Sequence, residues 1–135
     1  MDKPMQSLPQ PRLPSAAATA KTNVTTKSVN VTVREVETDN DTFLRYADQP
    51  MIAFVMFFSQ HRTAVADRDM EQMTRELIDA ALHSGGRYYL PYRLHASVEQ
   101  FRSAYPRSVE FFRLKQQYDP KKLFENEFYM KYASP

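Results

Sequence analysis

The chain has 135 residues, a length that fits a single domain. A formal net charge of +2 and 25% charged residues give no reason to expect nucleic acid or an anionic membrane surface as a partner. The sequence has no cysteine, which excludes disulfides and thiolate chemistry and fits a reducing, cytoplasmic compartment. Only Gly85 and Gly86 are glycines, so a P-loop and a GxGxxG motif for nucleotide phosphates are both excluded. No apolar run approaches the roughly eighteen residues that a membrane span needs.

The N-terminal segment, residues 1–28, is rich in Pro, Ser, Ala and Thr and has no hydrophobic period. Such a composition does not bury enough apolar surface to offset the entropy of ordering the chain. We therefore expect a disordered leader at 1–28 and a folded domain at 29–135.

Two stretches predict β-strands. Val29, Val31 and Val33 alternate with polar residues, which is typical of a strand with one face in water. Residues 51–58 are apolar at every position, which is typical of a strand in the middle of a sheet with both faces covered. Because an isolated domain rarely covers both faces of a small sheet, this stretch indicates that another element or chain covers the second face.

Helix signals lie before and after the second of these strands. Thr38 or Asp39 is a suitable N-cap for a short helix through Tyr46. A longer helix is predicted to end at Gly85–Gly86, where glycine can adopt a left-handed conformation. Its apolar stripe is formed by Met70, Met73, Leu77 and Ala81, widened by Ile78 and Leu82. Methionines in such a stripe suit an adaptable binding face or, more commonly, a core.

The last third contains a predicted third strand and two further helices. Residues 87–90 read as an aromatic strand that ends at Pro91. Ser97 is the expected N-cap of the next helix, Pro106 interrupts that helix, and a second helix ends before Pro120. Residues 123–129 alternate aromatic and polar side chains without a clear helical or strand periodicity. Together these elements predict an α+β fold, an antiparallel sheet with helices packed on one face, followed by a helical C-terminal segment.

At the end of the third strand and in the loop that follows it, Tyr89, Tyr92, Arg93 and His95 place phenols, a guanidinium and an imidazole within seven residues. These groups suit an anionic or electron-rich ligand, since Arg stabilises negative charge and His exchanges protons near neutral pH. The same residues also occur in ordinary surface packing, which the residues alone favour. We expect no metal site, because no histidines have metal-ligand spacing. The chain also lacks paired carboxylates and a nucleophile elbow, so no common class of self-sufficient enzyme is indicated.

The order of motifs in the last third is more specific. Residues 89–95 (YLPYRLH) are followed by Phe101 through Tyr105-Pro106, and then by a DPxxxFxNxF element at 119–128. This order resembles the C-terminal part of FAD-dependent oxidases and dehydrogenases of the vanillyl-alcohol oxidase superfamily, in the branch of the sugar-lactone and alditol oxidases and the cytokinin dehydrogenases. Residues 29–86 are compatible with part of the cap domain of that family.

The resemblance implies FAD as cofactor and oxidation of a hydroxyl- or amine-bearing carbon of a small molecule by hydride transfer to the flavin. It implies that His95 and Asn126 bind the cofactor near the isoalloxazine ring, and that Arg93 and Tyr89 act as catalytic residues toward the substrate or the flavin edge. The lactone-oxidase branch has Arg-Pro-His-Trp followed by glycine and lysine. Here Leu94 replaces the proline, so lactone specificity is not expected.

The sequence contains no counterpart of the family's FAD-binding domain. We therefore expect residues 29–135 to be the C-terminal cap and substrate domain of a flavin oxidoreductase, truncated or docking on an FAD-binding partner chain, and inactive alone. The alternative is a free-standing small α+β module without flavin, which binds a ligand or forms a homodimer through an exposed face.

Overall fold

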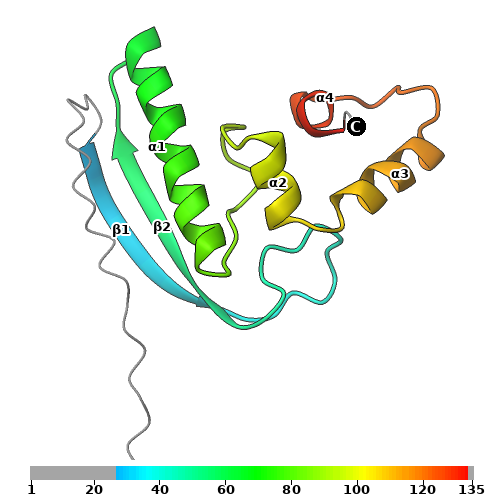
Figure 1. The fold of residues 1–135 in the computed structure, drawn as a ribbon, viewed down its shortest axis with the longest axis horizontal. Helices are drawn as coiled ribbons and strands as arrows, with labels where there is room; N and C mark the ends of the chain where they lie inside the picture. The colour runs from blue at the N-terminus through cyan, green and yellow to red at the C-terminus, as the bar shows by residue number, and fades with distance from the viewer. Residues whose placement is uncertain (1–26, 134–135) are drawn as a thin grey trace, which may run out of the picture.

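A computed structural model of the protein describes residues 27–133. Figure 1 shows a pair of strands at one end and helices that extend away from it. The predicted leader, residues 1–28, lies outside the described residues apart from its last two, which begin the first strand. The elements in chain order are β1 (Lys27–Val36), β2 (Met51–Ser59), α1 (Ala64–His83), α2 (Val98–Ala104), α3 (Ser108–Tyr118) and α4 (Glu127–Tyr132).

The sheet of the described residues consists of β1 and β2 alone, paired antiparallel. The register places Val33 opposite Phe54 and Val31 opposite Met56, with an irregularity between Ser28 and Asn30. The alternation of valines correctly predicted β1. The prediction of a middle strand at 51–58 was wrong for the described chain, because β2 has one neighbouring strand.

The predicted third strand at 87–90 was also wrong. This segment runs without regular secondary structure. Side-chain hydrogen bonds connect this segment to its neighbours in place of a strand ladder: the Arg87 side chain donates a 2.8 Å hydrogen bond to the carbonyl of Arg45, and the Tyr105 hydroxyl donates to the carbonyl of Tyr88. The aromatic composition of this segment therefore reflects side-chain packing, with the ring of Tyr88 against Tyr105 and the ring of Tyr89 against Tyr46, and not strand pairing.

No helix forms between β1 and β2, so the short helix predicted there was wrong. The carboxylate of Asp39 accepts hydrogen bonds of 3.0 Å from the backbone N–H groups of Asp41 and Thr42. These bonds close a local turn, which competes with the helix that an aspartate could also have capped.

Helix α1 ends at the predicted glycines, but it begins at Ala64, earlier than the expected start after Asp67. The hydroxyl of Thr63 accepts a 3.2 Å hydrogen bond from the N–H of Ala66, and Gly85 has a φ of 73° after the last turn. A side chain at Gly85 would be strained in this left-handed conformation. The core interpretation of the methionine stripe is confirmed for Met70 and Ile78, which are buried, but Leu77 is 37% exposed.

The core lies where α2 packs between α1 and α4, with Phe112 of α3 at its edge. Helix α2 has the capping box expected from Ser97, whose hydroxyl accepts from the N–H of Gln100 while the Gln100 side chain accepts from Ser97. Phe101 of α2 is fully buried, and its ring stacks on Tyr132 of α4 at 4.5 Å between centroids. Helix α4 was not predicted, because its six residues are too few to show a period.

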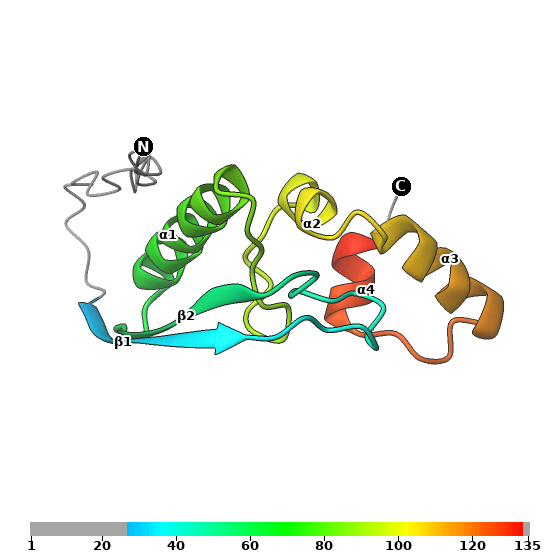
Figure 2. The ribbon, with the colours of Figure 1, turned by 90° about the horizontal axis from the view of Figure 1, so that it is seen from below.

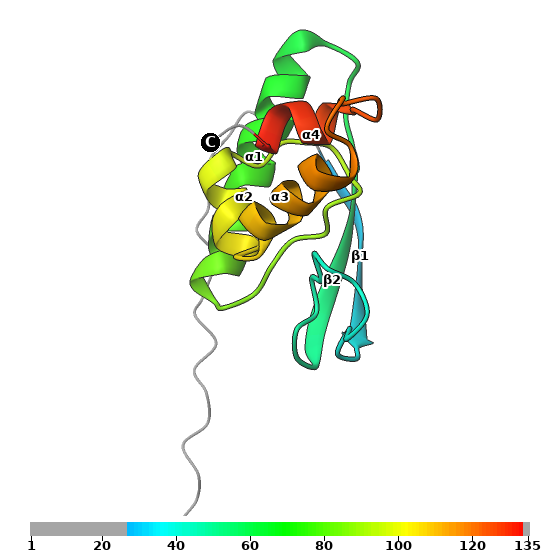
Figure 3. The same ribbon diagram turned by 90° about the vertical axis from the view of Figure 1, so that its right-hand side faces the viewer.

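All helices lie on one side of the sheet, and the other side is open in the described structure (Figures 2 and 3). This confirms the predicted α+β fold with an antiparallel sheet and helices on one face. The open side exposes apolar side chains, with Phe54 62% and Val33 59% exposed. We call this surface the bare face; its members are Val31, Val33, Ile52, Phe54 and Met56.

Candidate functional site

The candidate site is the loop of residues 87–97, which lies along α1. From the C-terminal end of α1 the loop runs back toward the N-terminal end of that helix, where Arg93 lies 3.4 Å from Asp67. It then reverses, so that His95 lies opposite Thr74 and the backbone carbonyl of His95 accepts a 2.8 Å hydrogen bond from Arg75. Pro91 prevents regular strand or helix structure in the middle of this excursion.

Arg93 is the most accessible charged group of the loop, with 62% of its side chain exposed. One Nη1 atom lies 3.3 Å from the side-chain oxygen of Gln60 and 3.4 Å from Asp67. These are long contacts that leave the other N–H donors of the guanidinium for a ligand. An exposed ion pair of this kind contributes little to stability, so the arginine can exchange partners readily.

His95 is half-buried and hydrogen-bonded, with Nδ1 at 3.1 Å from the hydroxyl of Thr74. That hydroxyl donates its own proton to the carbonyl of Met70 at 2.7 Å. Nδ1 must therefore carry the hydrogen and donate to Thr74, which leaves Nε2 as an acceptor when the ring is neutral. Burial, followed by the positive charge of Arg93, lowers the pKa of His95 and favours the neutral ring.

Three tyrosines form a row beside this loop. The ring of Tyr89 meets Tyr46 and Tyr92 edge-to-face, each at 5.4 Å between centroids. Tyr89 and Tyr92 are exposed, whereas Tyr46 is half-buried against the core. The row offers an aromatic surface with accessible hydroxyls, suited to a planar or hydroxylated ligand.

Asn126 does not join this cluster through any contact within residues 27–133. It is the N-cap of α4, and its side-chain oxygen accepts a 2.9 Å hydrogen bond from the N–H of Tyr129. The structure therefore brings Tyr89, Arg93 and His95 together on one loop and gives Asn126 a capping role, with its amide N–H groups still exposed.

The turn before Asn126 explains the spacing of the DPxxxFxNxF element. The carboxylate of Asp119 accepts hydrogen bonds from the N–H groups of Leu123 at 2.8 Å and Phe124 at 3.0 Å, and it pairs with Lys115. Lys122 has a φ of 52°, the left-handed conformation that lets the chain reverse. The aspartate and the asparagine of this element thus each organise the backbone.

Lys131 is a site residue that sequence reasoning missed. From α4 it donates a hydrogen bond to the carbonyl of Leu94, directly before His95. Burial is the main cause of a lowered Lys131 pKa, and Arg75 adds to it. Asn126 as a helix cap could have indicated this residue. Lys131 lies five residues beyond the cap, about 7.5 Å along the helix axis, and therefore at the end of α4 that meets the loop.

Within residues 27–133 no three His, Cys, Asp or Glu side chains are grouped so that they could hold a metal ion. None of the helices described is long and apolar enough to cross a bilayer. Comparison with known proteins found no family model, no curated protein and no solved structure that matches this chain.

Proposed function

We propose that this chain is the C-terminal cap and substrate portion of an FAD-linked oxidoreductase in the cytoplasm. FAD is supplied by a polypeptide region outside these 135 residues, on a partner chain or on the same one. When bound, the flavin accepts a hydride from a hydroxyl- or amine-bearing carbon of a small molecule. Without that region the chain does not turn over substrate.

The observation that carries the proposal is the bare face. Five apolar side chains on β1 and β2 stay exposed on a sheet of two strands. A two-stranded sheet is marginal on its own, and a contiguous apolar patch of this kind marks an interaction surface. A folded FAD-binding region that packs there accounts for a strand that is apolar at every position from 51 to 58.

Arg93 and His95 of the loop, together with Asn126 at the start of α4, offer groups for one end of a flavin and not for the other. Arg93 has free donors and the amide N–H groups of Asn126 are exposed, so carbonyl and imine groups of an isoalloxazine ring have suitable donors, while Nε2 of His95 can accept from a ring N–H. The same residues offer no glycine-rich cradle for the pyrophosphate. A cap portion without its FAD-binding region is expected to have groups for the flavin ring and none for the pyrophosphate, as this chain does.

In this assignment Arg93 binds and orients the substrate or holds negative charge that develops at the flavin edge. Tyr89 supplies an exposed ring and hydroxyl to position the substrate carbon. His95, with Nδ1–H fixed on Thr74, accepts a proton or a hydrogen bond at Nε2. Lys131 holds the loop through the carbonyl of Leu94 and thereby positions His95.

The test begins with the purified 135-residue chain, mixed with FAD and then dialysed. We expect a colourless protein that retains no flavin. The chain is then tagged and recovered from its native cells, and the flavin absorbance of the recovered complex is measured. We expect one flavin per copy of this chain. Retention of flavin by the isolated chain, or a stoichiometric complex without flavin, contradicts the proposal.

A second candidate function is a free-standing module that forms a homodimer without flavin, because an exposed apolar face such as the bare face can pack against the same face of a second copy. Light scattering after size-exclusion chromatography separates the two. A stable homodimer in the absence of any flavoprotein favours the module, and a monomer that becomes a heteromer with an FAD-binding protein favours the cap portion.

A further inference from the structure

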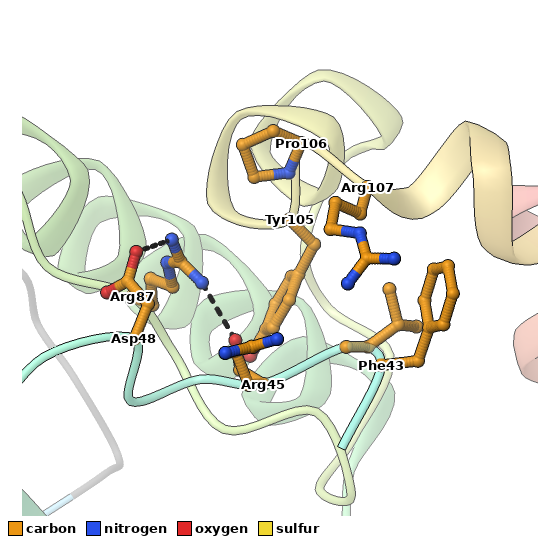
Figure 4. Close-up of a pocket in the computed structure, with 8 residues that line it drawn as sticks. Phe43, Arg45, Asp48, Arg87, Tyr105, Pro106 and Arg107 are labelled. Atoms are coloured by element: carbon orange, nitrogen blue, oxygen red, sulfur yellow. Dashed lines mark hydrogen bonds and ion pairs between the residues drawn. The ribbon is translucent and has the colours of Figure 1, made fainter. Parts of the chain in front are cut away.

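A second concave surface lies away from the 87–97 loop tip and from the bare face. It is an open cavity of about 240 Å³ between the 43–48 segment and the corner where α2 meets α3 (Figure 4). Three arginines, Arg45, Arg87 and Arg107, line it, and Asp48 is the one carboxylate among the lining residues. Positive charge is therefore in excess at this cavity.

Arg87 forms the fixed wall of the cavity. Only 18% of its side chain is exposed. Its Nη1 donates a 2.8 Å hydrogen bond to the carbonyl of Arg45, and its Nη2 pairs with Asp48. These contacts satisfy the donors of Arg87 and hold the 43–48 segment in place, so the N–H donors left for a ligand belong to the two other arginines.

Arg107 is oriented but retains free donors. Its Nε lies 3.1 Å from the carboxylate of Glu110, and its guanidinium carbon lies 4.0 Å from the centre of the Phe43 ring. Stacking and ion pairing through Nε fix the plane of the guanidinium. The Nη groups make no hydrogen bond with residues 27–133, so they remain available to a ligand.

Arg45 provides the second set of free donors. Its guanidinium makes no hydrogen bond within the described chain, and its charge acts on Asp39, whose pKa is lowered mainly by a hydrogen bond from Thr42. Arg45 and Arg107 both line the cavity; Figure 4 shows Arg45 on the 43–48 segment below Tyr105 and Arg107, at the start of α3, beside Phe43.

We propose that this cavity binds the phosphoryl group of a small phosphate monoester. Two guanidiniums offer paired N–H groups in forks that match anionic oxygens. A carboxylate has two oxygens and satisfies one fork, whereas a phosphoryl group has three terminal oxygens and can serve both. The volume is below the roughly 300 Å³ at which pockets for larger ligands begin, so one phosphoryl group with a short appendage fits. The site shares no residue with the proposed flavin assignment and does not depend on it.

The experiment is a titration of the full chain, followed by amide chemical shifts, with inorganic phosphate, glycerol phosphate, ADP and acetate as separate probes. If the chain is recovered only as a complex, the complex is titrated. We expect saturable binding of both phosphates with shifts at residues 43–48 and 105–110, weaker binding of ADP, and the weakest of acetate. Tighter binding of ADP than of glycerol phosphate overturns the monoester assignment.

The variants Arg45→Gln and Arg107→Gln should each weaken phosphate binding about tenfold, the effect of losing one charge-assisted contact. Arg113→Gln, a change of the same charge on α3 outside the cavity, should leave binding unchanged. Equal losses in all three variants show a general charge effect and refute the site. If a variant does not fold, the wild-type titration decides: no saturable response at phosphate concentrations on the order of 10 mM, where a millimolar site is filled, refutes it as well.

Discussion

The hydroxyl of Tyr132 donates a 3.0 Å hydrogen bond to the backbone carbonyl of Ala96, and the two residues are only 2% and 1% exposed. One belongs to α4 and the other lies at the end of the candidate loop, where the chain enters α2. The contact therefore fastens the C-terminal helix to the loop that carries Arg93 and His95. The stacking of Tyr132 on Phe101 extends the same contact into the core.

This buried bond predicts a measurable loss of stability. Tyr132→Phe keeps the ring but leaves the carbonyl of Ala96 without its donor, which should lower the free energy of unfolding by about 1–3 kcal/mol. Urea denaturation measures the change. Tyr118→Phe is the matched control, since Tyr118 is 84% exposed, and it should change stability by less than about 0.5 kcal/mol. Equal effects of the two changes contradict the role of the bond.

Asn126 allows its capping role to be separated from its proposed flavin contact. Asn126→Asp keeps an oxygen that accepts from the N–H of Tyr129 but removes the amide donor. We expect stability within about 0.5 kcal/mol of the wild type, and flavin binding in the complex weakened about tenfold. Asn126→Ala should lower stability by about 1 kcal/mol through loss of the cap. Unchanged flavin binding in Asn126→Asp would show that the asparagine serves the helix alone.

The lowered pKa of His95 predicts a dependence of stability on pH. Burial favours the neutral ring in the folded state, so the unfolded chain, with a pKa near 6.5, takes up the proton first as the pH falls. The stabilising contribution is present above pH 6.5 and is lost below it. Denaturation at pH 7 and pH 5 should show a larger decrease in stability for the wild type than for His95→Gln. If the free energy of unfolding changes between pH 7 and pH 5 by the same amount in the wild type and in His95→Gln, the result argues against a buried neutral histidine.

The lowered pKa of Asp119 predicts a second dependence of stability on pH, which arises from hydrogen bonds to the charged form and not from burial. The hydrogen bond from Lys115, aided by the N–H groups of Phe124 and Leu123, lowers the pKa of Asp119 from 3.8 to about 2. A carboxylate with a lowered folded-state pKa stabilises the fold above its unfolded pKa and loses that effect as the pH falls from 3.8 toward 2. Asp119→Asn should therefore be less stable than the wild type at pH 6, and the two should converge near pH 2. If the difference in stability between the wild type and Asp119→Asn is the same at pH 2 as at pH 6, the variant is destabilised by altered packing and not by loss of the carboxylate charge.

We expect apolar residues of the bare face to contribute to association with another molecule, and buried apolar residues to contribute to the stability of the fold. Phe54→Lys changes an exposed side chain and should alter the free energy of unfolding by less than about 1 kcal/mol, and under the proposed function it should disrupt association with the FAD-binding region. Phe101→Ala, at a fully buried ring of similar size, should lower stability by about 3–5 kcal/mol. Co-purification and urea denaturation of both variants test this. Intact association in Phe54→Lys removes the bare face from the interface.

The sequence-based predictions that were confirmed depend on interactions between residues close together in the chain. The capping box at Ser97, the glycine after α1 and the alternating valines of β1 were confirmed, because each depends on residues within one turn or one strand. The proposed roles of Arg93, Tyr89, His95 and Asn126 stay predictions. The sequence did place the first three on one loop, since proximity over seven residues needs no tertiary information.

Tertiary structure decided the rest. Residues 87–90 and 51–58 both have strand-like composition, yet only the second pairs; the first is held by the bond from Arg87 to the carbonyl of Arg45 and by the bond from Tyr105 to the carbonyl of Tyr88. Helix α4 forms because Asn126 caps it and Tyr132 packs on Phe101, a contact between residues far apart in the chain. The cavity of the three arginines likewise joins segments separated by tens of residues. Sequence fixes what a residue can do locally, but which distant groups meet is settled by packing, since burial and hydrogen-bond satisfaction are properties of the whole fold.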